Sequence, residues 1–255
     1  MTGENKVSII TPVYNAERFI ERTMDSVRAQ TYENWELLLT ADCCTDNTVE
    51  IIERYLAEKK DDRIRLIMLE KNQGAAAARN RGLAESTGRF VAYLDADDLW
   101  RPEKLERTMK FLQEKEAAFV FTGYEFADND ANGTGTVVHT PETLTYRQAL
   151  GNTTIFTSTV MFDTAKIEKK DLNMPKIESE DTALWWNVLR KGYLAYGLDE
   201  NLVLYRRPDG GSLSSNKLKA IRRIWNLYRR NEGFGVLKSS YFFCFWAVRA
   251  VQRRL

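Results

Sequence analysis

The chain has 255 residues, with 37 Lys and Arg against 36 Asp and Glu, and this length suits one α/β catalytic domain with an appendage. Its three cysteines include the adjacent pair Cys43 and Cys44 and form no CxxC pattern, so we expect a reducing compartment and no structural disulfide. No signal-peptide pattern opens the chain, and the apolar run Tyr241–Val248 is far shorter than the roughly 20 residues that cross a bilayer. We therefore expect a cytoplasmic protein that does not span a membrane.

The first 115 residues alternate β-rich runs with helical patterns. This alternation predicts βαβ units, a Rossmann-like arrangement and a mostly parallel central sheet. Ligands are then expected at the carboxyl ends of the strands. The expected strands are Lys6–Thr11, Trp35–Thr40, Arg63–Met68 and Arg89–Leu94, and the expected helices are Ala16–Gln30, Asp46–Lys59, Gly74–Ser86 and Pro102–Lys115.

Beyond residue 115 the pattern is less regular. Further strands are expected at Ala118–Thr122, Thr136–His139 and Ser158–Phe162, which finish the sheet and form the acceptor side. Residues 180–191 predict a helix, and the Pro- and Gly-containing stretch Arg206–Ser215 predicts a mobile loop.

Polar groups follow the first two strands. The first strand runs into Thr11-Pro12-Val13-Tyr14-Asn15, where Tyr14 offers a flat face on which a base can stack. Asp42 follows the second strand and can accept the imide N–H of a pyrimidine. Taken alone, each segment is more typical of an ordinary strand-to-helix turn.

The cluster Asp95-Ala96-Asp97-Asp98 directly follows the apolar strand that ends at Leu94. Three carboxylates within four positions repel one another, and a divalent cation shared with water and a diphosphate resolves this conflict. The alternative is a solvated turn that caps the helix expected at Pro102.

Glu180 and Asp181 open the helix expected at residues 180–191. Acids in a first turn are ordinary, because they complement the positive end of the helix dipole, and Ser179 is a suitable cap. On these residues alone a structural interpretation is favoured over a catalytic one.

Taken in order, these motifs resemble family 2 of the inverting glycosyltransferases, which have the GT-A fold. The resemblance covers about residues 6–215. It implies one catalytic domain at 1–215, with a nucleotide-sugar half at about 1–115 and an acceptor half at about 116–215, followed by a basic helical tail at 216–255. The matching segments are VSIITPVYN (7–15), SVRAQTY (26–32), Asp42 with TDNT (45–48), NQG (72–74), ARNRG (78–82), YLDADD (93–98), Glu180-Asp181 and Tyr205-Arg206.

The resemblance implies roles for the first half. Tyr14 and Asp42 match the residues that hold the nucleotide base, and Thr11 and Pro12 match the floor beneath it. Arg79 stands where it can meet the nucleotide or its phosphates. Asp97, with Asp95 beside it, matches the ligands of Mn²⁺ or Mg²⁺, a Lewis acid for the leaving diphosphate.

In the second half Asp181 matches the catalytic base, which implies direct attack of the acceptor oxygen and inversion at the anomeric carbon. The segment after Tyr205 matches a flexible donor loop, where Arg206 or Arg207 can meet the diphosphate. The QxxRW signature of processive synthases is absent, which favours transfer of one sugar per encounter.

The tail, residues 216–255, carries ten Lys and Arg against the single acid Glu232, interleaved with aromatic residues. One interpretation is a basic amphipathic segment on an anionic membrane, which fits a lipid-linked acceptor and a place at the inner face of the membrane. The other is a helical pair whose aromatic side packs on the catalytic domain. Nucleic acid is not expected, because the aromatics form a dense cluster rather than a spaced stacking platform.

Two other functions are weighed against the transferase. A sugar nucleotidyltransferase normally has a glycine-rich loop after its first strand, and Thr11–Asn15 contains no glycine. A catalytically inactive relative would bind nucleotide or serve as a scaffold, and the retained carboxylates argue against it. The Tyr14 and Asp42 matches indicate UDP, whereas the sequence indicates neither the sugar, the acceptor nor the oligomeric state.

Overall fold

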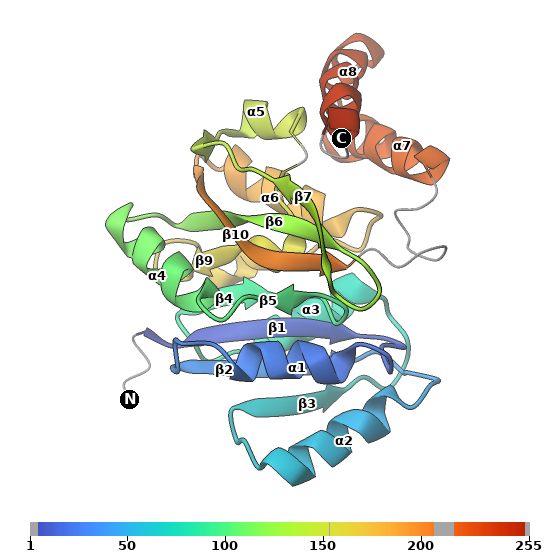
Figure 1. Cartoon of the computed structure of the whole chain (residues 1–255). Coiled ribbons are helices and arrows are strands. Elements are labelled where there is room, and N and C mark those ends of the chain that lie inside the picture. Colours follow the sequence, from blue (N-terminus) through green and yellow to red (C-terminus); the bar gives the residue numbers. More distant parts are fainter. Residues whose placement is uncertain (1–4, 153, 207–216, 253–255) are drawn as a thin grey trace.

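The structure is a computed structural model that describes residues 5–152, 154–206 and 217–252. A single mixed sheet runs through the molecule, with helices on both faces (Figure 1). In chain order the elements are β1 (Val7–Val13), α1 (Ile20–Arg28), β2 (Trp35–Ala41), α2 (Thr48–Lys59), β3 (Ile64–Met68), α3 (Ala75–Glu85), β4 (Phe90–Tyr93), β5 (Leu99–Trp100), α4 (Lys104–Glu114), β6 (Phe119–Ala127), β7 (Gly133–Val138), β8 (Thr143–Leu144), α5 (Tyr146–Leu150), η2 (Thr157–Thr159), β9 (Met161–Asp163), η3 (Lys169–Leu172), α6 (Glu180–Arg190), β10 (Ala195–Arg206), α7 (Lys217–Asn226), η4 (Leu227–Asn231) and α8 (Val236–Gln252).

The strand order is β3-β2-β1-β4-β9-β6-β10-β5, with β7 beside β6 and β8 beside β10. Strands β3, β2, β1 and β4 are parallel, as the βαβ alternation predicts. β9 then runs antiparallel to both β4 and β6, while β10 is parallel to β6. The predicted α/β class is confirmed, and the parallel arrangement belongs chiefly to the first half of the chain.

Two hydrophobic cores sandwich the sheet. On one face, buried residues of β1 and β2 pack against α1, α2 and α4, with Trp35, Met24 and Leu105 among them. On the other face, Phe119 and Phe162 pack beneath α6, where Trp185 stacks on Phe162 with a centroid distance of 5.8 Å. These two cores hold the sheet edges at which the polar side chains lie.

Two local expectations need correction, and one glycine has a steric role. Helix α1 begins at Ile20 rather than Ala16. Gly88 has no room for a side chain, because a Cβ there would lie 2.5 Å from the carbonyl oxygen of Lys6. The 12-residue strand β10 was not predicted, and its pairing with β6 shifts register twice, after Leu198 and after Asn201.

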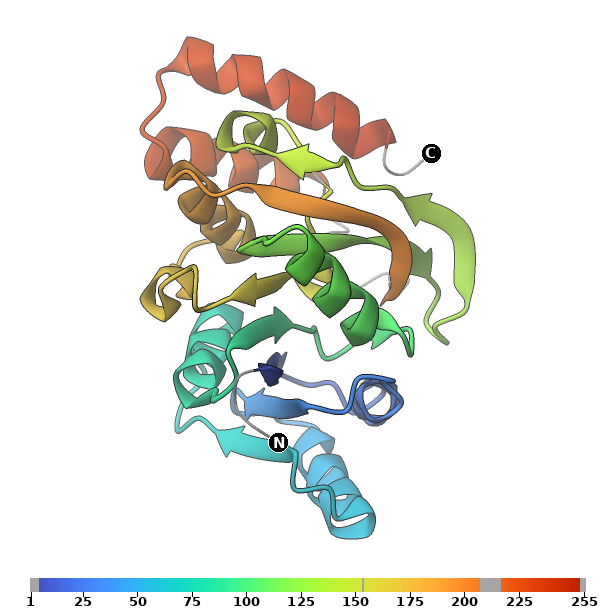
Figure 2. The ribbon, with the colours of Figure 1, turned by 90° about the vertical axis from the view of Figure 1, so that its left-hand side faces the viewer.

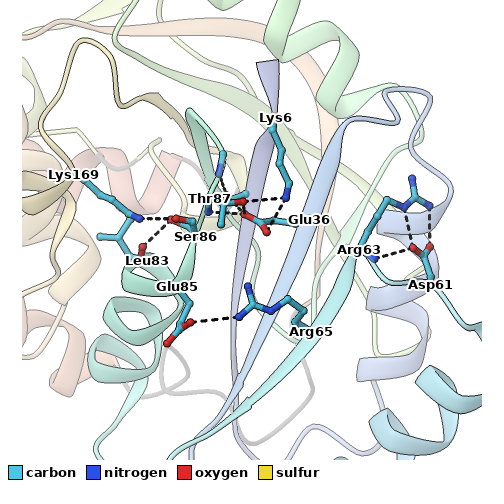
Figure 3. A network of polar contacts seen from close by, with 12 residues as sticks. Lys6, Glu36, Asp61, Arg63, Arg65, Leu83, Glu85, Ser86, Thr87 and Lys169 are labelled. Atoms are coloured by element: carbon cyan, nitrogen blue, oxygen red, sulfur yellow. Dashed lines mark hydrogen bonds and ion pairs between the residues drawn. The ribbon is translucent and has the colours of Figure 1, made fainter. Parts of the chain in front are cut away.

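A polar network joins the amino ends of β1, β2 and β4 (Figure 3). Ser8 and Glu36 face each other across the β1–β2 pair, and the Ser8 hydroxyl donates to the Glu36 carboxylate over 2.6 Å. The same carboxylate accepts from the backbone N–H of Thr87 at 2.7 Å and from the Lys6 ammonium at 3.0 Å. Burial alone would raise the pKa of Glu36, but these donors outweigh it and lower the pKa to about 2.

Helices α7 and α8 lie at the end of the molecule opposite β3 and α2 (Figures 1 and 2). The Tyr228 ring stacks on Trp186 of α6 with a centroid distance of 5.2 Å, and Phe242 of α8 stacks on Tyr228 at 6.4 Å. The Glu232 carboxylate accepts from Arg190 and from the Tyr146 hydroxyl. Aromatic residues of the tail therefore pack on the remainder of the chain, which is one of the two interpretations of the tail.

Candidate active site

The carboxyl ends of β1, β2 and β4 bring together three of the predicted segments. Parallel pairing aligns Val13 with Ala41 and Ile10 with Tyr93, so the residues that follow each strand share one edge of the sheet. Tyr14 and Asp42 come directly after the first pair, and Asp95 follows β4. This is the edge at which a parallel α/β sheet binds its ligands.

Asp42 is almost fully buried and holds a neighbouring loop. Its two carboxylate oxygens accept from the backbone N–H groups of Gln73 at 2.8 Å and Gly74 at 2.7 Å. Gly74 has a φ of 85°, a left-handed conformation that favours glycine, and it precedes α3. The first role of Asp42 is therefore to fix the turn that leads into α3.

The first predicted segment has a buried base and an exposed tip. Thr11 is completely buried, and its hydroxyl has no hydrogen-bond partner among the described residues. Pro12 is half-buried, whereas the Tyr14 side chain is 52% exposed. Asn15 accepts from the backbone N–H of Thr45 at 2.8 Å, which ties this loop to the loop after β2. An exposed aromatic ring thus stands beside the buried Asp42.

Asp97 and Asp98, the last two residues of the acidic turn 95–98, differ in the hydrogen bonds that they accept. Asp98 is completely buried and accepts from the Ser158 hydroxyl and from the backbone N–H of Arg206, so it fastens η2 and the end of β10 to the turn. The carboxylate of Asp97 accepts no hydrogen bond from another residue in the described part of the chain. Burial, with repulsion from Asp95, raises the pKa of Asp97 to about 6 despite the opposing attraction of Arg206.

The alternative interpretation of a solvated cap is not supported. Asp98 has no exposed surface, and α4 begins at Lys104 after Glu103 without a side-chain cap. Burial and the carboxylates of Asp97 and Asp95 raise the pKa of Asp98 well above its ordinary value. Acids held this close together in a partly buried turn are electrostatically suited to a cation.

Arg79 joins the acidic turn to α6. Its guanidinium lies 2.6 Å from an Asp95 oxygen and 2.9 Å from a Glu180 oxygen, and it is nearly fully buried. Burial alone would lower the pKa of Arg79, but the two carboxylates outweigh it and raise the pKa above its ordinary value. In this structure the Arg79 guanidinium contacts two acids, and its contact with a nucleotide stays a prediction.

Asp181 lies in the first turn of α6 and is partly exposed. One carboxylate oxygen accepts from the Thr157 hydroxyl at 3.2 Å, and the other accepts from the backbone N–H of Thr182 at 2.6 Å. Ser179 does not cap the helix as predicted, because it is left-handed at a φ of 58° and its side chain makes no cap hydrogen bond. The side chain of Asp181 is thus oriented without an ion-pair partner in the described residues.

Arg206 ends β10 inside the molecule. It is 1% exposed, its three guanidinium nitrogens have no hydrogen-bond partner among the residues that the structure describes, and it lies over the Phe19 ring at 4.6 Å. Burial lowers the pKa of Arg206, while Asp97 and Asp98 oppose the change. Arg207 and the remainder of the predicted donor loop to Ser215 lie outside the described residues.

Two contributors, Thr157 and Ser158, were missed at the level of sequence, and Glu180 was recognised only as part of a motif. Thr157 and Ser158 of η2 contact Asp181 and Asp98, and Glu180 binds Arg79. No local pattern marks Thr157 or Ser158, since their partners lie 24 and 60 residues away. In the ranges that the structure covers, no three His, Cys, Asp or Glu side chains are grouped so as to hold a metal ion by themselves.

The chain is similar to known glycosyltransferases over most of its length. The model of the family described as "Glycosyl transferase family 2" matches residues 8–170. TuaG, a Bacillus subtilis (strain 168) protein provisionally named a teichuronic acid biosynthesis glycosyltransferase, is 43% identical over 98% of this chain and 97% of its own length. The Escherichia coli protein WfgD, named a UDP-Glc:alpha-D-GlcNAc-diphosphoundecaprenol beta-1,3-glucosyltransferase, is 36% identical over 87% of this chain and 84% of its own.

Two solved structures share the fold. S. aureus TarS 1-349 in complex with UDP-GlcNAc superposes with a TM-score of 0.71 at 21% identity, covering 96% of this chain and 72% of that one. The mannosyltransferase PcManGT from Pyrobaculum calidifontis, in complex with GDP-Man and Mn²⁺, has a TM-score of 0.73 at 18% identity, covering 97% and 74%. At these identities the likeness concerns the arrangement of helices and strands.

Proposed function

The chain belongs to glycosyl transferase family 2, and from this we propose that it transfers a sugar, with inversion, from a UDP-sugar to an acceptor hydroxyl. The proposal rests on two sets of contacts that connect the acidic turn with the first residues of α6. Asp95 reaches Glu180 through Arg79, and Asp98 and Asp181 contact the adjacent residues Ser158 and Thr157. Two acidic motifs more than 80 residues apart thereby lie in one site.

For the donor, we propose that the exposed ring of Tyr14 stacks on the base above Thr11 and Pro12. Asp42, whose oxygens already accept from Gln73 and Gly74, fixes the rim of the base site and has remaining lone pairs for an imide N–H. UDP is supported by TarS, solved with UDP-GlcNAc, and by the name of WfgD. PcManGT, solved with GDP-Man, shows that the fold also serves another base.

The residues present fit a divalent cation. Asp97 is partly buried, its pKa is raised, and it accepts no hydrogen bond from another described residue. Asp95 lies beside it, so a cation would relieve the repulsion between the two carboxylates. We propose that Asp97, with Asp95, holds Mn²⁺ or Mg²⁺ together with water and the diphosphate. Bound there, the ion supplies charge neutralisation for the leaving diphosphate. The Mn²⁺ in PcManGT supports this assignment.

We propose Asp181 as the general base. It accepts the proton of the acceptor hydroxyl while that oxygen forms its bond to the anomeric carbon and the bond from that carbon to the diphosphate breaks. Attack from the face opposite the diphosphate inverts the anomeric centre. The hydrogen bonds from Thr157 and Thr182 orient the carboxylate for this step.

Two arginines complete the proposed site. Arg79 acts as a positioning residue, because it ties Asp95 and Glu180 to α3 and so sets the spacing between the acidic turn and α6. The buried guanidinium of Arg206 lies at the end of β10, and no described residue accepts a hydrogen bond from it. Its N–H donors are therefore suited to the oxygens of a diphosphate. We propose the same role for Arg207.

The acceptor is proposed to be a lipid-linked glycan in the assembly of a bacterial surface polysaccharide. The support is the name of WfgD, whose acceptor sugar is carried on diphosphoundecaprenol, and that of TuaG. Residues 1–215 then form the catalytic domain, with a nucleotide-sugar half at about 1–115 and an acceptor half at about 116–215, and the protein works at the inner face of the membrane.

The proposal is tested by incubating the protein with a panel of UDP-sugars, Mn²⁺ and lipid-linked acceptors, and measuring UDP release and the anomeric configuration of the product. We expect Asp181→Asn to bind UDP normally and to transfer sugar at least a hundredfold more slowly, the typical share of a general base. The matched control is Asp62→Asn, an exposed acid far from this edge, which should transfer normally.

Two outcomes contradict the proposal. Near-normal transfer by Asp181→Asn removes that residue from the mechanism. Stabilisation of the protein by UDP and Mn²⁺ without transfer from any donor indicates a nucleotide-binding relative that has lost catalysis.

A further inference from the structure

Helix α8 has two different sides. Its inner side carries Phe242 and Ser239, both buried against the remainder of the protein, and Arg249 donates to the carbonyl of Gly151 at 2.7 Å. This side anchors the helix. The packing of the tail therefore buries one side of α8 and leaves its other side exposed.

The outer side of α8 is a continuous apolar stripe. Its members are spaced by three or four positions, which places them on one face of a helix, and each is between 46% and 89% exposed. The stripe is about 21 Å long at 1.5 Å per residue. Its residues, called the α8 stripe below, are Leu237, Tyr241, Phe245, Val248 and Val251.

Cations border one side of this stripe, and the described part of the tail has no acid on the outer surface of α8. Lys238 and Arg249 are exposed and lie next to Phe245 on the helical wheel, along one side of the stripe, and Arg249 also donates to the carbonyl of Gly151. The acid of the tail, Glu232, turns inward to Arg190 and has a side-chain exposure of 1%. Within the described tail, the outer surface of α8 is thus apolar with a basic border.

We propose that the α8 stripe lies in the headgroup region of an anionic lipid membrane. A helix with exposed aliphatic and aromatic side chains beside Lys and Arg has the pattern of helices that lie in this interface. Among the described residues no helix is long and apolar enough to cross a membrane, so α8 lies along the surface. A second copy of the chain fits less well, because a two-fold contact through this stripe brings the basic borders of the two copies together.

The position of α8 links the membrane to the acceptor side of the site. Tyr228, which Phe242 of α8 stacks on, itself stacks on Trp186 of α6, five residues after Asp181. That separation is about 7.5 Å along the helix axis. The membrane contact is independent of the transfer reaction, and only its use for a lipid-linked acceptor rests on the proposed function.

The test is cosedimentation of the full chain with vesicles of phosphatidylglycerol and phosphatidylethanolamine, and with vesicles of phosphatidylcholine alone. We expect binding to the anionic vesicles and at least about tenfold weaker partitioning for Leu237→Glu, because the change puts a charge at the most exposed position of the stripe. Lys238→Gln should weaken binding to anionic vesicles about fivefold and leave neutral vesicles unaffected.

The matched control is Met68→Glu, which makes the same kind of change at a side chain 53% exposed at the end of β3, far from the tail. It should bind vesicles as the unaltered chain does. Point variants are preferred to deletion of residues 216–255, because deletion would uncover Trp186.

The inference is overturned if the unaltered chain stays in the supernatant with anionic vesicles, or if Leu237→Glu binds as well as Met68→Glu. A dimer in solution that Leu237→Glu converts to a monomer, without vesicle binding, would assign the stripe to a second copy. Sugar transfer to a soluble acceptor analogue separates these outcomes from failure of the proposed function, since it needs no membrane.

Discussion

Two acids lie at opposite edges of the parallel strands β1, β2 and β4. Glu36 is buried at the amino edge, and Asp97 is partly buried beyond the carboxyl edge. Glu36 accepts from Ser8, Thr87 and Lys6, and its pKa is lowered to about 2. Asp97 accepts from no other residue in the described ranges, and burial beside Asp95 raises its pKa to about 6. The same sheet therefore stabilises one carboxylate and destabilises the other.

This difference distinguishes Glu36, which stabilises the fold, from Asp97, which we propose binds a ligand. At the amino edge the donors come from β1 and from the residues before β4, so the carboxylate joins three strands. At the carboxyl edge no other described residue donates to Asp97, and the attraction of Arg206 and Arg79 does not offset burial and the repulsion of Asp95, which is typical of functional sites. The predictions that follow test whether the two acids differ in this way.

The largest effect is expected for Asp97→Asn. Loss of a metal ligand should slow sugar transfer about a thousandfold, because the ion is expected to lower the activation free energy by several kcal/mol when it neutralises the leaving diphosphate. The ligand-free variant should nevertheless melt at a higher temperature than the unaltered chain at pH 7.5. The ionised Asp97 costs stability as the pH rises through about 6, and asparagine carries no such cost.

Differential scanning fluorimetry with and without UDP and Mn²⁺ checks both parts of this prediction. The unaltered chain should be stabilised by the two ligands together, and Asp97→Asn should not. Equal stabilisation of both proteins, or transfer by the variant within tenfold of normal, would mean that Asp97 does not hold the cation.

The sequence predicted the first half of the fold well because its strands are continuous apolar runs separated by amphipathic helices. β10 escaped prediction since Gly197 and the polar residues 199–201 interrupt its pattern, and the structure accommodates them as two register shifts against β6. The boundaries of α1 and the conformation of Ser179 depend on packing rather than on local preference.

For the site, ordered motifs named Asp97, Asp181 and Tyr14, but not the contacts that join them. Arg79 meets Glu180 across 101 positions, and Ser158 meets Asp98 across 60. Such partners depend on tertiary structure, which no local periodicity encodes. The motifs therefore predict which acids carry the chemistry, whereas only the fold shows that Asp98 and Arg79 make structural contacts.

The second prediction concerns pH at the amino edge. The pKa of Glu36 is lowered from 4.5 to about 2, so its contribution to stability is complete above pH 4.5 and is lost as the pH falls toward 2. The loss should amount to about 3 kcal/mol. Urea unfolding at pH 5, 4 and 3 should show this slope, and Glu36→Gln should remove it while Glu53→Gln, an exposed control on α2, keeps it. A slope unchanged in Glu36→Gln would place the titrating acid elsewhere.

The smallest effect is expected for Lys6→Met. The Lys6 side chain is 29% exposed, and an ion pair that water can reach contributes little, so we expect the free energy of unfolding to fall by about 1 kcal/mol or less. Glu36 would keep its hydrogen bonds from Ser8 and from the backbone and side chain of Thr87. Urea denaturation at pH 7 measures the change, with Lys110→Met, an exposed lysine on α4, as the control. If Lys6→Met cost as much as Glu36→Gln, a single cation would hold the amino edge. Glu36 and Asp97 would then differ because Glu36 has one opposite charge beside it, and not because it has a full set of hydrogen-bond donors.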